Sequence, residues 1–459
     1  MPTSKDTIDV TDHSIDATIF ALSSAQGRAG VAVIRVSGPN AGGAVDLMAA
    51  PRPKPRFAAF RKLRHPITQE IIDEALVLFF AAPRTETGED MAEFQVHGGR
   101  AVVGAMLSAL AEVPGCRLAE AGEFARRSFE NGKIDLTAAE GLADLVDAET
   151  EGQRRQALRQ AGGALARLYD GWRLQIVSAL ALVEAGLDFS DEPDVGRDAI
   201  RDAGGVVRGL LSDIHDHLAD GRRGEILRDG YQVVLAGPPN SGKSSLLNAL
   251  ARRDAAIVSP EAGTTRDVIE VRLDLEGLPV VVADTAGLHE ATGSIEREGI
   301  RRTRERAAKA DLVLWLVDGG SACAVPSLTE PPHEFAPPGV DVLRLFTKAD
   351  LANPRPLGTD LVVSALTGEG IGVLASAIAD CAKARIGMTE DPVLTTVRHR
   401  KQIETCRDAL QSFMVGSLAE PELRAEDLRR AASALGRITG RVDIEDILDQ
   451  IFGRFCIGK

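Results

Sequence analysis

The sequence predicts a multidomain fold of α/β and all-α parts, in which an α/β domain with a parallel sheet is inserted into a helical domain. The chain has 459 residues, enough for about three domains at roughly 150 residues each. Continuous helical periodicity begins near residue 131, is interrupted, and returns near residue 386. The interruption contains the strongest motif in the chain.

Residues 1–130 alternate between strand-like and helix-like runs. The strand-like runs are GVAVIRVSG (30–38) and EALVLFFAAP (74–83), and VVGAMLSALAEV (102–113) is helix-like. This alternation predicts an α/β domain over residues 1–130.

Residues 131–228 and 386–459 have the spacing of long amphipathic helices. TAAE, with Thr137 and Glu140, fits a capping box at a helix start. Apolar residues then recur every three or four positions, at Leu165, Leu168, Trp172, Ile176, Leu180, Val183 and Leu187. LRAEDLRRAASALGRI (423–438) shows the same texture. We therefore expect two helical halves that pack together, with residues 229–385 inserted between them.

Composition narrows the class of protein. The first twenty residues lack a secretory signal, and no run of 18 apolar residues occurs, so we expect a cytoplasmic protein with no membrane association. The five cysteines are widely spaced and form no C-x-x-C pair, which predicts reduced thiols. The net charge of −14 predicts weak non-specific binding to nucleic acid.

The inserted segment opens with a phosphate-binding loop. An apolar run at 233–236 precedes the pattern G-x-x-x-x-G-K-S, formed by Gly237, Gly242, Lys243 and Ser244, and an amphipathic helix follows. In such a loop, backbone N–H groups surround phosphate oxygens, the lysine reaches the β and γ phosphates, and the serine hydroxyl ligates Mg²⁺.

Four later motifs stand in the order that a GTP-binding domain requires. AGTTRD supplies Thr265 for Mg²⁺ and the γ-phosphate. The apolar run LPVVVAD ends in Asp284, which can hold Mg²⁺ through a water molecule. LRLFTKAD supplies Asp350, whose carboxylate accepts hydrogen bonds from guanine but faces a lone pair on adenine. The backbone of Ser364–Leu366 is suited to guanine O6. Thr347 stands where Asn is usual, so the bond that Asn donates to the base is not predicted.

Hydrolysis needs a group other than the glutamine of Ras-like enzymes, because Leu288 follows DTAG. Asn240 could coordinate a monovalent cation beside the phosphates, or it could be a neutral polar residue of the loop. Glu296 could position the attacking water, or it could belong to the solvated face of a helix.

The whole chain resembles the bacterial tRNA modification GTPases of the MnmE (TrmE) family. The resemblance is carried by the loop with Asn240, GTTRD, DTAGL with IEREGI, the N-terminal GVAVIRVSG and EFQVHGG, and the terminal CIGK. It implies a potassium-dependent GTPase that hydrolyses GTP to GDP and phosphate. It further implies a homodimer joined through an N-terminal folate-binding domain and a heterotetramer with the FAD protein MnmG. Together they would add an aminomethyl or carboxymethylaminomethyl group to C5 of the wobble uridine of certain tRNAs.

The resemblance also assigns residues to sites. It places Mg²⁺ at Ser244 and Thr265, K⁺ at Asn240, Ser259, Glu261 and Thr264, and catalysis at Glu296 and Cys456. It assigns a 5-formyl- or methylene-tetrahydrofolate site to Arg35, Glu93, Lys133 and Lys459. The GTP site implied by the motifs and the resemblance comprises Asn240, Ser241, Gly242, Lys243, Ser244, Ser245, Ser259, Pro260, Glu261, Ala262, Gly263, Thr264, Thr265, Asp284, Thr285, Ala286, Gly287, Thr347, Lys348, Ala349, Asp350, Ser364, Ala365 and Leu366.

The terminal CIGK leaves three interpretations of Cys456. The spacing is that of a prenylation signal, but the final Lys459 argues against a lipid anchor. A frayed tail is the simplest alternative. The third is a reactive thiol carried to the folate site, with Gly458 allowing a close backbone fit.

Two other function classes stay open. A regulatory GTPase of ribosome assembly or translation would share the inserted domain but should bring an RNA-binding module. A free-standing folate-dependent transferase, in which the GTPase only controls assembly, is the second.

Overall fold

The computed structural model describes residues 17–188, 193–253, 256–257, 270–284, 305–319, 331–351, 361–387, 393–417, 420–442, 445–453 and 455–458. These residues form two compact units. The first contains the described residues up to Ala143 together with those from Gly440 onward, and the second spans Asp144–Thr439.

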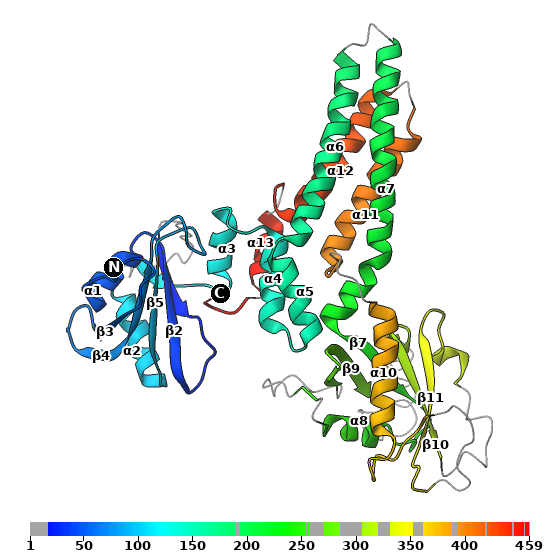
Figure 1. Ribbon diagram of the computed structural model, residues 1–459, viewed down its shortest axis with the longest axis horizontal. Helices are drawn as coiled ribbons and strands as arrows, with labels where there is room; N and C mark the ends of the chain where they lie inside the picture. Colours follow the sequence, from blue (N-terminus) through cyan, green and yellow to red (C-terminus); the bar gives the residue numbers. More distant parts are fainter. Residues whose placement is uncertain are drawn as a thin grey trace, which may run out of the picture. The chain divides into compact units, whose positions relative to one another are not determined.

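The first unit contains a six-stranded sheet in the order β3-β4-β5-β2-β1-β6. Its pairs are antiparallel except for β1 with β6. Helices α1 (Ala41–Ala49) and α2 (Arg100–Ala111) pack on one face, around a core that includes Ile34, Met48, Phe94 and Met106 (Figure 1). The strands are β1 (Thr18–Leu22), β2 (Ala29–Ser37), β3 (Ala59–Arg64), β4 (Ile71–Phe80), β5 (Met91–Gly98) and β6 (Cys116–Leu118). The predicted strands at 30–38 and 74–83 and the predicted helix at 102–113 are confirmed.

Short helices join the C-terminal segment to this unit. They are α3 (Glu123–Glu130), the start of α4 (Leu136–Asp147) and α13 (Glu445–Phe452), which share a small core with Phe455. The C-terminal segment from Gly440 onward therefore belongs to the same unit as the N-terminal sheet.

The predicted capping box at Thr137 is wrong. Helix α4 begins one residue earlier, at Leu136, and the carboxylate of Asp135 accepts hydrogen bonds from the backbone N–H groups of Thr137 and Ala138. Asp is an equally good N-cap residue, and the motif pattern selected the wrong polar side chain. A capping box does occur farther along, between Thr150 and Gln153 at the start of α5 (Glu151–Ala161).

The helical part of the second unit is built from both sides of the insertion. Helices α6 (Ala164–Asp188) and α7 (Pro193–Asp229) precede it, and α11 (Val397–Val415) and α12 (Pro421–Thr439) follow it (Figure 1). All four contribute to one core that includes Tyr169, Ile176, Leu210, Leu410 and Leu428. The prediction that the two helical halves pack together is confirmed for these helices. None of the helices among the described residues is both long and apolar enough to cross a bilayer.

The inserted part is an α/β domain with the sheet order β12-β11-β10-β7-β9-β8. All pairs are parallel except β8 with β9. The strands are β7 (Tyr231–Ala236), β8 (Glu270–Leu275), β9 (Leu278–Asp284), β10 (Leu312–Asp318), β11 (Asp341–Thr347) and β12 (Leu361–Val362). Helices α8 (Lys243–Ala251) and α10 (Ile371–Ile386) pack against the sheet in one core, which includes Leu247, Val282 and Ile378.

A buried ionic chain connects α3 to the sheet of the first unit. Arg127 bridges Glu123 at 3.0 Å and Glu89 at 3.1 Å, and Glu123 also binds Arg117 at 2.6 Å. Burial by itself raises the pKa of Glu123, but hydrogen bonds from Arg117, from a backbone N–H and from Arg127 lower it below its ordinary value.

We predict that Glu123→Gln reduces stability at neutral pH by about 3 kcal/mol, because the buried guanidinium of Arg127 then keeps only Glu89 as an opposite charge. A lowered carboxyl pKa stabilises the fold above the unfolded-state pKa, and that stability is lost as the pH falls through the folded-state value. The variant should therefore show a flatter loss of thermal midpoint on acidification than the parent. Glu130→Gln, at a more exposed ion pair with Arg126, is the control and should change neither quantity. An unchanged acid profile in the Glu123 variant would remove this carboxylate from the acid response.

Candidate functional site

The predicted nucleotide residues gather at one edge of the parallel sheet. The P-loop follows β7, Asp284 ends β9, and Thr347 ends β11. The carboxyl ends of parallel strands meet at the same edge, which is where α/β sheets bind ligands. The fold thus brings together motifs that are more than 100 residues apart.

The backbone of the P-loop requires its glycines. Gly237 has φ +152°, and a Cβ there would lie 2.5 Å from the carbonyl oxygen of Leu316. Gly242 has φ +89° directly before α8, so that the free N–H groups of the helix start face the loop. Asn240 also has a left-handed φ of +63° and is exposed, with its side chain available to a ligand.

The residues predicted at the phosphate end of the site lie on α8 and β9. Lys243 donates to the loop carbonyls of Gly237 and Pro238 at 3.0 and 2.9 Å. Burial lowers the pKa of Lys243, while the carboxylate of Asp284 opposes the shift. The Ser244 hydroxyl donates to Asp284 at 2.6 Å. A hydroxyl and a carboxylate at this spacing are the hard oxygen ligands that Mg²⁺ prefers.

Ser241 adds an unpaired polar atom to the loop. Its side chain is 1% exposed, and among the described residues its Oγ has no hydrogen-bond partner. A buried hydroxyl without a partner is costly unless a ligand or water satisfies it. This hydroxyl therefore fits a loop that is completed by phosphate.

The residues predicted to contact the base lie in the segments after β11 and β12. The Ser364 hydroxyl donates to the carboxylate of Asp350 at 2.6 Å, which holds that carboxylate in place. Lys348, with φ +54°, donates to Asp318 at the end of β10 at 2.7 Å. The Leu366 side chain is exposed, and that of Ala349 is buried. Sequence reasoning missed Asp318, although it ends the buried run LVLWLVD just as Asp284 ends another.

Thr347 connects the two ends of the site. Its hydroxyl donates to the carbonyl oxygen of Ser241 in the P-loop at 2.7 Å and lies 3.2 Å from that of Val317. The side chain is 4% exposed, so this hydroxyl bonds to the protein backbone and not to solvent. The residue that replaces the usual Asn thus holds the P-loop to β11.

Some predicted residues lie outside the described residues. These are Ser259, Pro260, Glu261, Ala262, Gly263, Thr264, Thr265, Thr285, Ala286, Gly287, Glu296 and Lys459.

A second group of predicted residues lies in the first unit. Arg35 on β2 and Glu93 on β5 are direct cross-strand partners, 3.3 Å apart. Arg35 also binds Glu86 at 2.9 Å, and its Nε is buried without a hydrogen-bond partner among the described residues. Lys133 donates to the carbonyl oxygen of Pro83. Arg35 and Lys133 thus both contact the loop between β4 and β5. Sequence reasoning missed Glu86, which carries no motif.

The C-terminal tail is docked on the same unit. Ile457 forms a β-bridge with Ala121, and the Ser23 hydroxyl donates to the carbonyl oxygen of Gly458 at 2.9 Å. Gly458 has φ +101°, and a Cβ there would lie 2.3 Å from the carbonyl oxygen of Leu22. Phe455 is buried and Cys456 is exposed. These contacts contradict the interpretation of residues 455–458 as a frayed tail.

Thr347→Val tests the connection between the two ends of the nucleotide site. The substitution keeps the shape but leaves the Ser241 carbonyl without its donor, so we expect a loss of about 1–3 kcal/mol. The thermal midpoint and the affinity for GDP should both fall, as measured by calorimetry. Thr347→Ser keeps a hydroxyl and should restore most of both. A valine variant equal to the parent would show that this bond does not position the loop.

The comparisons with known proteins cover nearly the whole chain. The family model described as GTP-binding protein TrmE N-terminus matches residues 18–133, and the MnmE helical domain model matches residues 136–456. Proteins named tRNA modification GTPase MnmE from Parvibaculum lavamentivorans and Methylorubrum populi are each 53% identical. The matches cover 96% and 97% of this chain and 100% and 98% of those proteins. The protein of that name from Rhodospirillum rubrum is 52% identical over 96% of this chain and 99% of its own length. The chain belongs to the MnmE family of tRNA modification GTPases.

Proposed function

We propose that this chain binds and hydrolyses GTP, yielding GDP and phosphate, and that it uses this activity in the modification of C5 of the wobble uridine in certain tRNAs. The observation that carries the proposal is the nucleotide site itself. Its phosphate end, with Lys243, Ser244 and Asp284, is joined to its base end by the bond from Thr347 to the P-loop. Family membership supplies the tRNA substrate.

Specific roles follow from these positions. Asp350, held by Ser364, accepts hydrogen bonds from the guanine base, and the backbone of Ala365 and Leu366 lies beside guanine O6. Lys243 moves from the loop carbonyls to the β and γ phosphates when nucleotide binds. Ser244 and Thr265, with Asp284 acting through water, would hold Mg²⁺, which would supply positive charge against the phosphates.

The side chain of Asn240 and the segment with Ser259, Glu261 and Thr264 would hold a potassium ion, which would supply positive charge beside the phosphates. The exposed position and left-handed backbone of Asn240 support this assignment, because the amide oxygen has no other role among the described contacts. Glu296 orients the attacking water. Ras-like enzymes use a glutamine for this, but the residue at that position here is Leu288, which cannot bind water.

The potassium assignment predicts faster GTP hydrolysis in K⁺ than in Na⁺ at equal ionic strength, by at least about tenfold, since a cationic element at the phosphates contributes roughly 10³ to 10⁵ in other GTPases. Asn240→Ala should remove the difference between the salts. Glu296→Ala should slow turnover while nucleotide affinity is kept, as expected of a group that acts in the transition state. Phosphate release and GDP titration measure these quantities. Equal rates in the two salts would eliminate the potassium site.

The modification site lies in the first unit, at Arg35 with its partners Glu86 and Glu93 and at the docked tail. Arg35 is the cross-strand partner of Ala21 on β1. The tail residue Gly458 packs on Leu22 and Ser23, the two residues that follow Ala21. Arg35 also lies 6.0 Å from the ring of Phe124, three residues from the bridge partner of the tail. Arg35, Glu93, Lys133 and Lys459 would hold a tetrahydrofolate, which would supply the one-carbon unit, and Cys456 would act in its chemistry.

The partners are a second copy of the chain, the FAD protein MnmG, and tRNA. The sheet face opposite α1 and α2 exposes Phe60 by 62% and Leu76 by 41%, and these residues are cross-strand partners. An open apolar sheet face supports a homodimer joined through the N-terminal domain. A cytoplasmic location follows from the tRNA substrate.

Cys456→Ser, or removal of residues 456–459, should abolish tRNA modification but leave folding, dimerisation and K⁺-stimulated GTP hydrolysis largely intact. Mass spectrometry of tRNA nucleosides from cells complemented with each variant measures the loss. Cys116→Ser is the matched control, because burial raises the pKa of that thiol to about 11 and keeps it protonated. Normal wobble uridines in cells that lack the whole protein would overturn the proposed function and favour a GTPase of ribosome assembly. Normal modification by the Cys456 variant alone would exclude only an essential thiol.

A further inference from the structure

The β8–β9 hairpin extends from the phosphate end of the nucleotide site to the helical part of the same unit. Strand β8 begins directly after the segment that contains the predicted ligand Thr265, and β9 ends at the predicted ligand-binding residue Asp284. The hairpin turn, Glu276–Gly277, lies at the opposite end of these strands. At about 3.3 Å per residue, the turn is roughly 20 Å from the phosphate end.

This turn makes a close backbone contact with the first turn of α5. The N–H of Gly152 donates to the carbonyl oxygen of Gly277 at 2.9 Å. A Cβ at Gly152 would lie 2.8 Å from that oxygen and 3.0 Å from the side chain of Leu227. Arg272 on β8 also binds Glu149, just before α5, at 3.3 Å. The contact as built therefore requires glycine at position 152.

The two ends of α5 are fixed to the places where the chain enters and leaves the inserted domain. The side chain of Gln153 closes the capping box with Thr150, and its Nε2 donates to the carbonyl oxygen of Arg228 at the end of α7, at 2.9 Å. Farther along α5, the hydroxyl of Thr395 donates to Gln160 at 2.9 Å. A displacement of α5 would thus reach both connections to the helical core.

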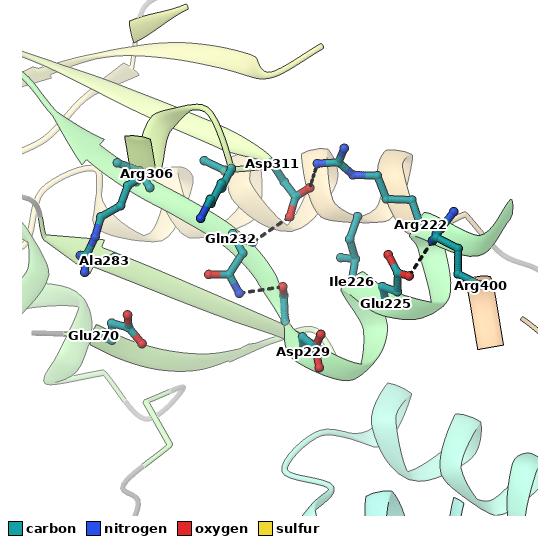
Figure 2. Close-up of a pocket in the computed structure, with 14 residues that line it drawn as sticks. Arg222, Glu225, Ile226, Asp229, Gln232, Glu270, Ala283, Arg306, Asp311 and Arg400 are labelled. Atoms are coloured by element: carbon teal, nitrogen blue, oxygen red, sulfur yellow. Dashed lines mark hydrogen bonds and ion pairs between the residues drawn. The ribbon is translucent and has the colours of Figure 1, made fainter. Parts of the chain in front are cut away.

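The base of the inserted sheet is fixed by separate contacts, which Figure 2 shows around a cavity of about 680 Å³. Asp311 accepts from Arg222 of α7 at 3.1 Å and from the backbone N–H of Gln232 in β7 at 3.0 Å. Arg400 of α11 binds Glu225 of α7 at 2.9 Å. Asp311, directly before β10, thus holds this end of the sheet to α7 and to β7, so the sheet has an attachment to α7 that is separate from the contact between the hairpin and α5.

We propose that the contact between the β8–β9 turn and the first turn of α5 transmits the nucleotide state from the phosphate end of the site to the helical part. The proposal rests on the proposed GTPase function and adds the route by which GTP binding and hydrolysis are coupled to the rest of the chain. Gly152 is a positioning residue in this route and contacts no nucleotide.

The test is Gly152→Ala, with Gly171→Ala as its matched control. Both positions are helical glycines, but a Cβ at Gly171 has nothing within 4 Å. Amide hydrogen exchange is measured on the full chain in K⁺ without nucleotide, with GDP, and with GDP and aluminium fluoride. In the parent and in Gly171→Ala, the exchange rate in residues 149–161 should differ between the protein with GDP alone and the protein with GDP and aluminium fluoride. In Gly152→Ala that difference should vanish, while nucleotide-dependent protection of residues 237–245 remains.

The functional result expected is a separation of activities. Gly152→Ala should keep K⁺-stimulated GTP hydrolysis but lower tRNA modification by roughly tenfold, within the range of ordinary coupling between sites. Leu278→Ala loosens the same contact by removing atoms, because Leu278 lies 3.8 Å from the Cβ position at Gly152. It should reproduce both effects if the alanine variant of Gly152 fails to fold.

Two results would overturn the route: an exchange rate in residues 149–161 that is the same in all nucleotide states of the parent, or a nucleotide-dependent difference that persists in both variants. Failure of the proposed function looks different, since residues 237–245 would then gain no protection from GDP in the parent.

Discussion

The architecture of the second unit depends on one backbone crossing. Where the chain leaves the inserted domain, it passes so close to α7 that a Cβ at Gly224 would lie 2.1 Å from the carbonyl oxygen of Leu394. One turn earlier, a Cβ at Gly221 would lie 2.8 Å from the Leu394 side chain. Two small residues on one helix face allow the returning segment to lie directly against α7. The insertion is tolerated because the two ends of the inserted domain meet here.

The helical core follows from this crossing. Helix α11 begins three residues after Leu394, already beside α7, so Ile403 and Leu410 enter the core that α6 and α7 leave incomplete. Helix α12 then packs on α6 and α11. Neither half could bury its apolar face alone, and the inserted sheet is therefore carried by helices from both halves of the chain.

The local parts of the fold and site could be predicted from sequence, and the long-range parts could not. The P-loop is specified within eight residues, since Gly237 and Gly242 supply the backbone conformation and Lys243 and Ser244 the chemistry. The two helical halves were equally visible, because amphipathic periodicity survives an insertion. The bond from Thr347 to Ser241 joins residues 106 positions apart. The Arg35 to Glu86 pair likewise depends on how a loop folds back over β2. The local prediction of Thr137 as the capping residue of α4 was wrong, because Asp135 caps this helix. Asp and Thr are both good N-cap residues, so the sequence alone does not decide between them.

The tail shows what such long-range contacts add to a short motif. The letters CIGK are compatible with a mobile end, but the structure fixes the chain on both sides of the thiol. Before it, Phe455 is buried against Phe452. After it, Gly458 lies where any larger residue would meet the backbone of Leu22. A side chain that is exposed while its neighbours are fixed is presented in a defined direction, and Cys456 and Ile457 are the two residues of the tail in that position, of which only Cys456 carries a reactive group.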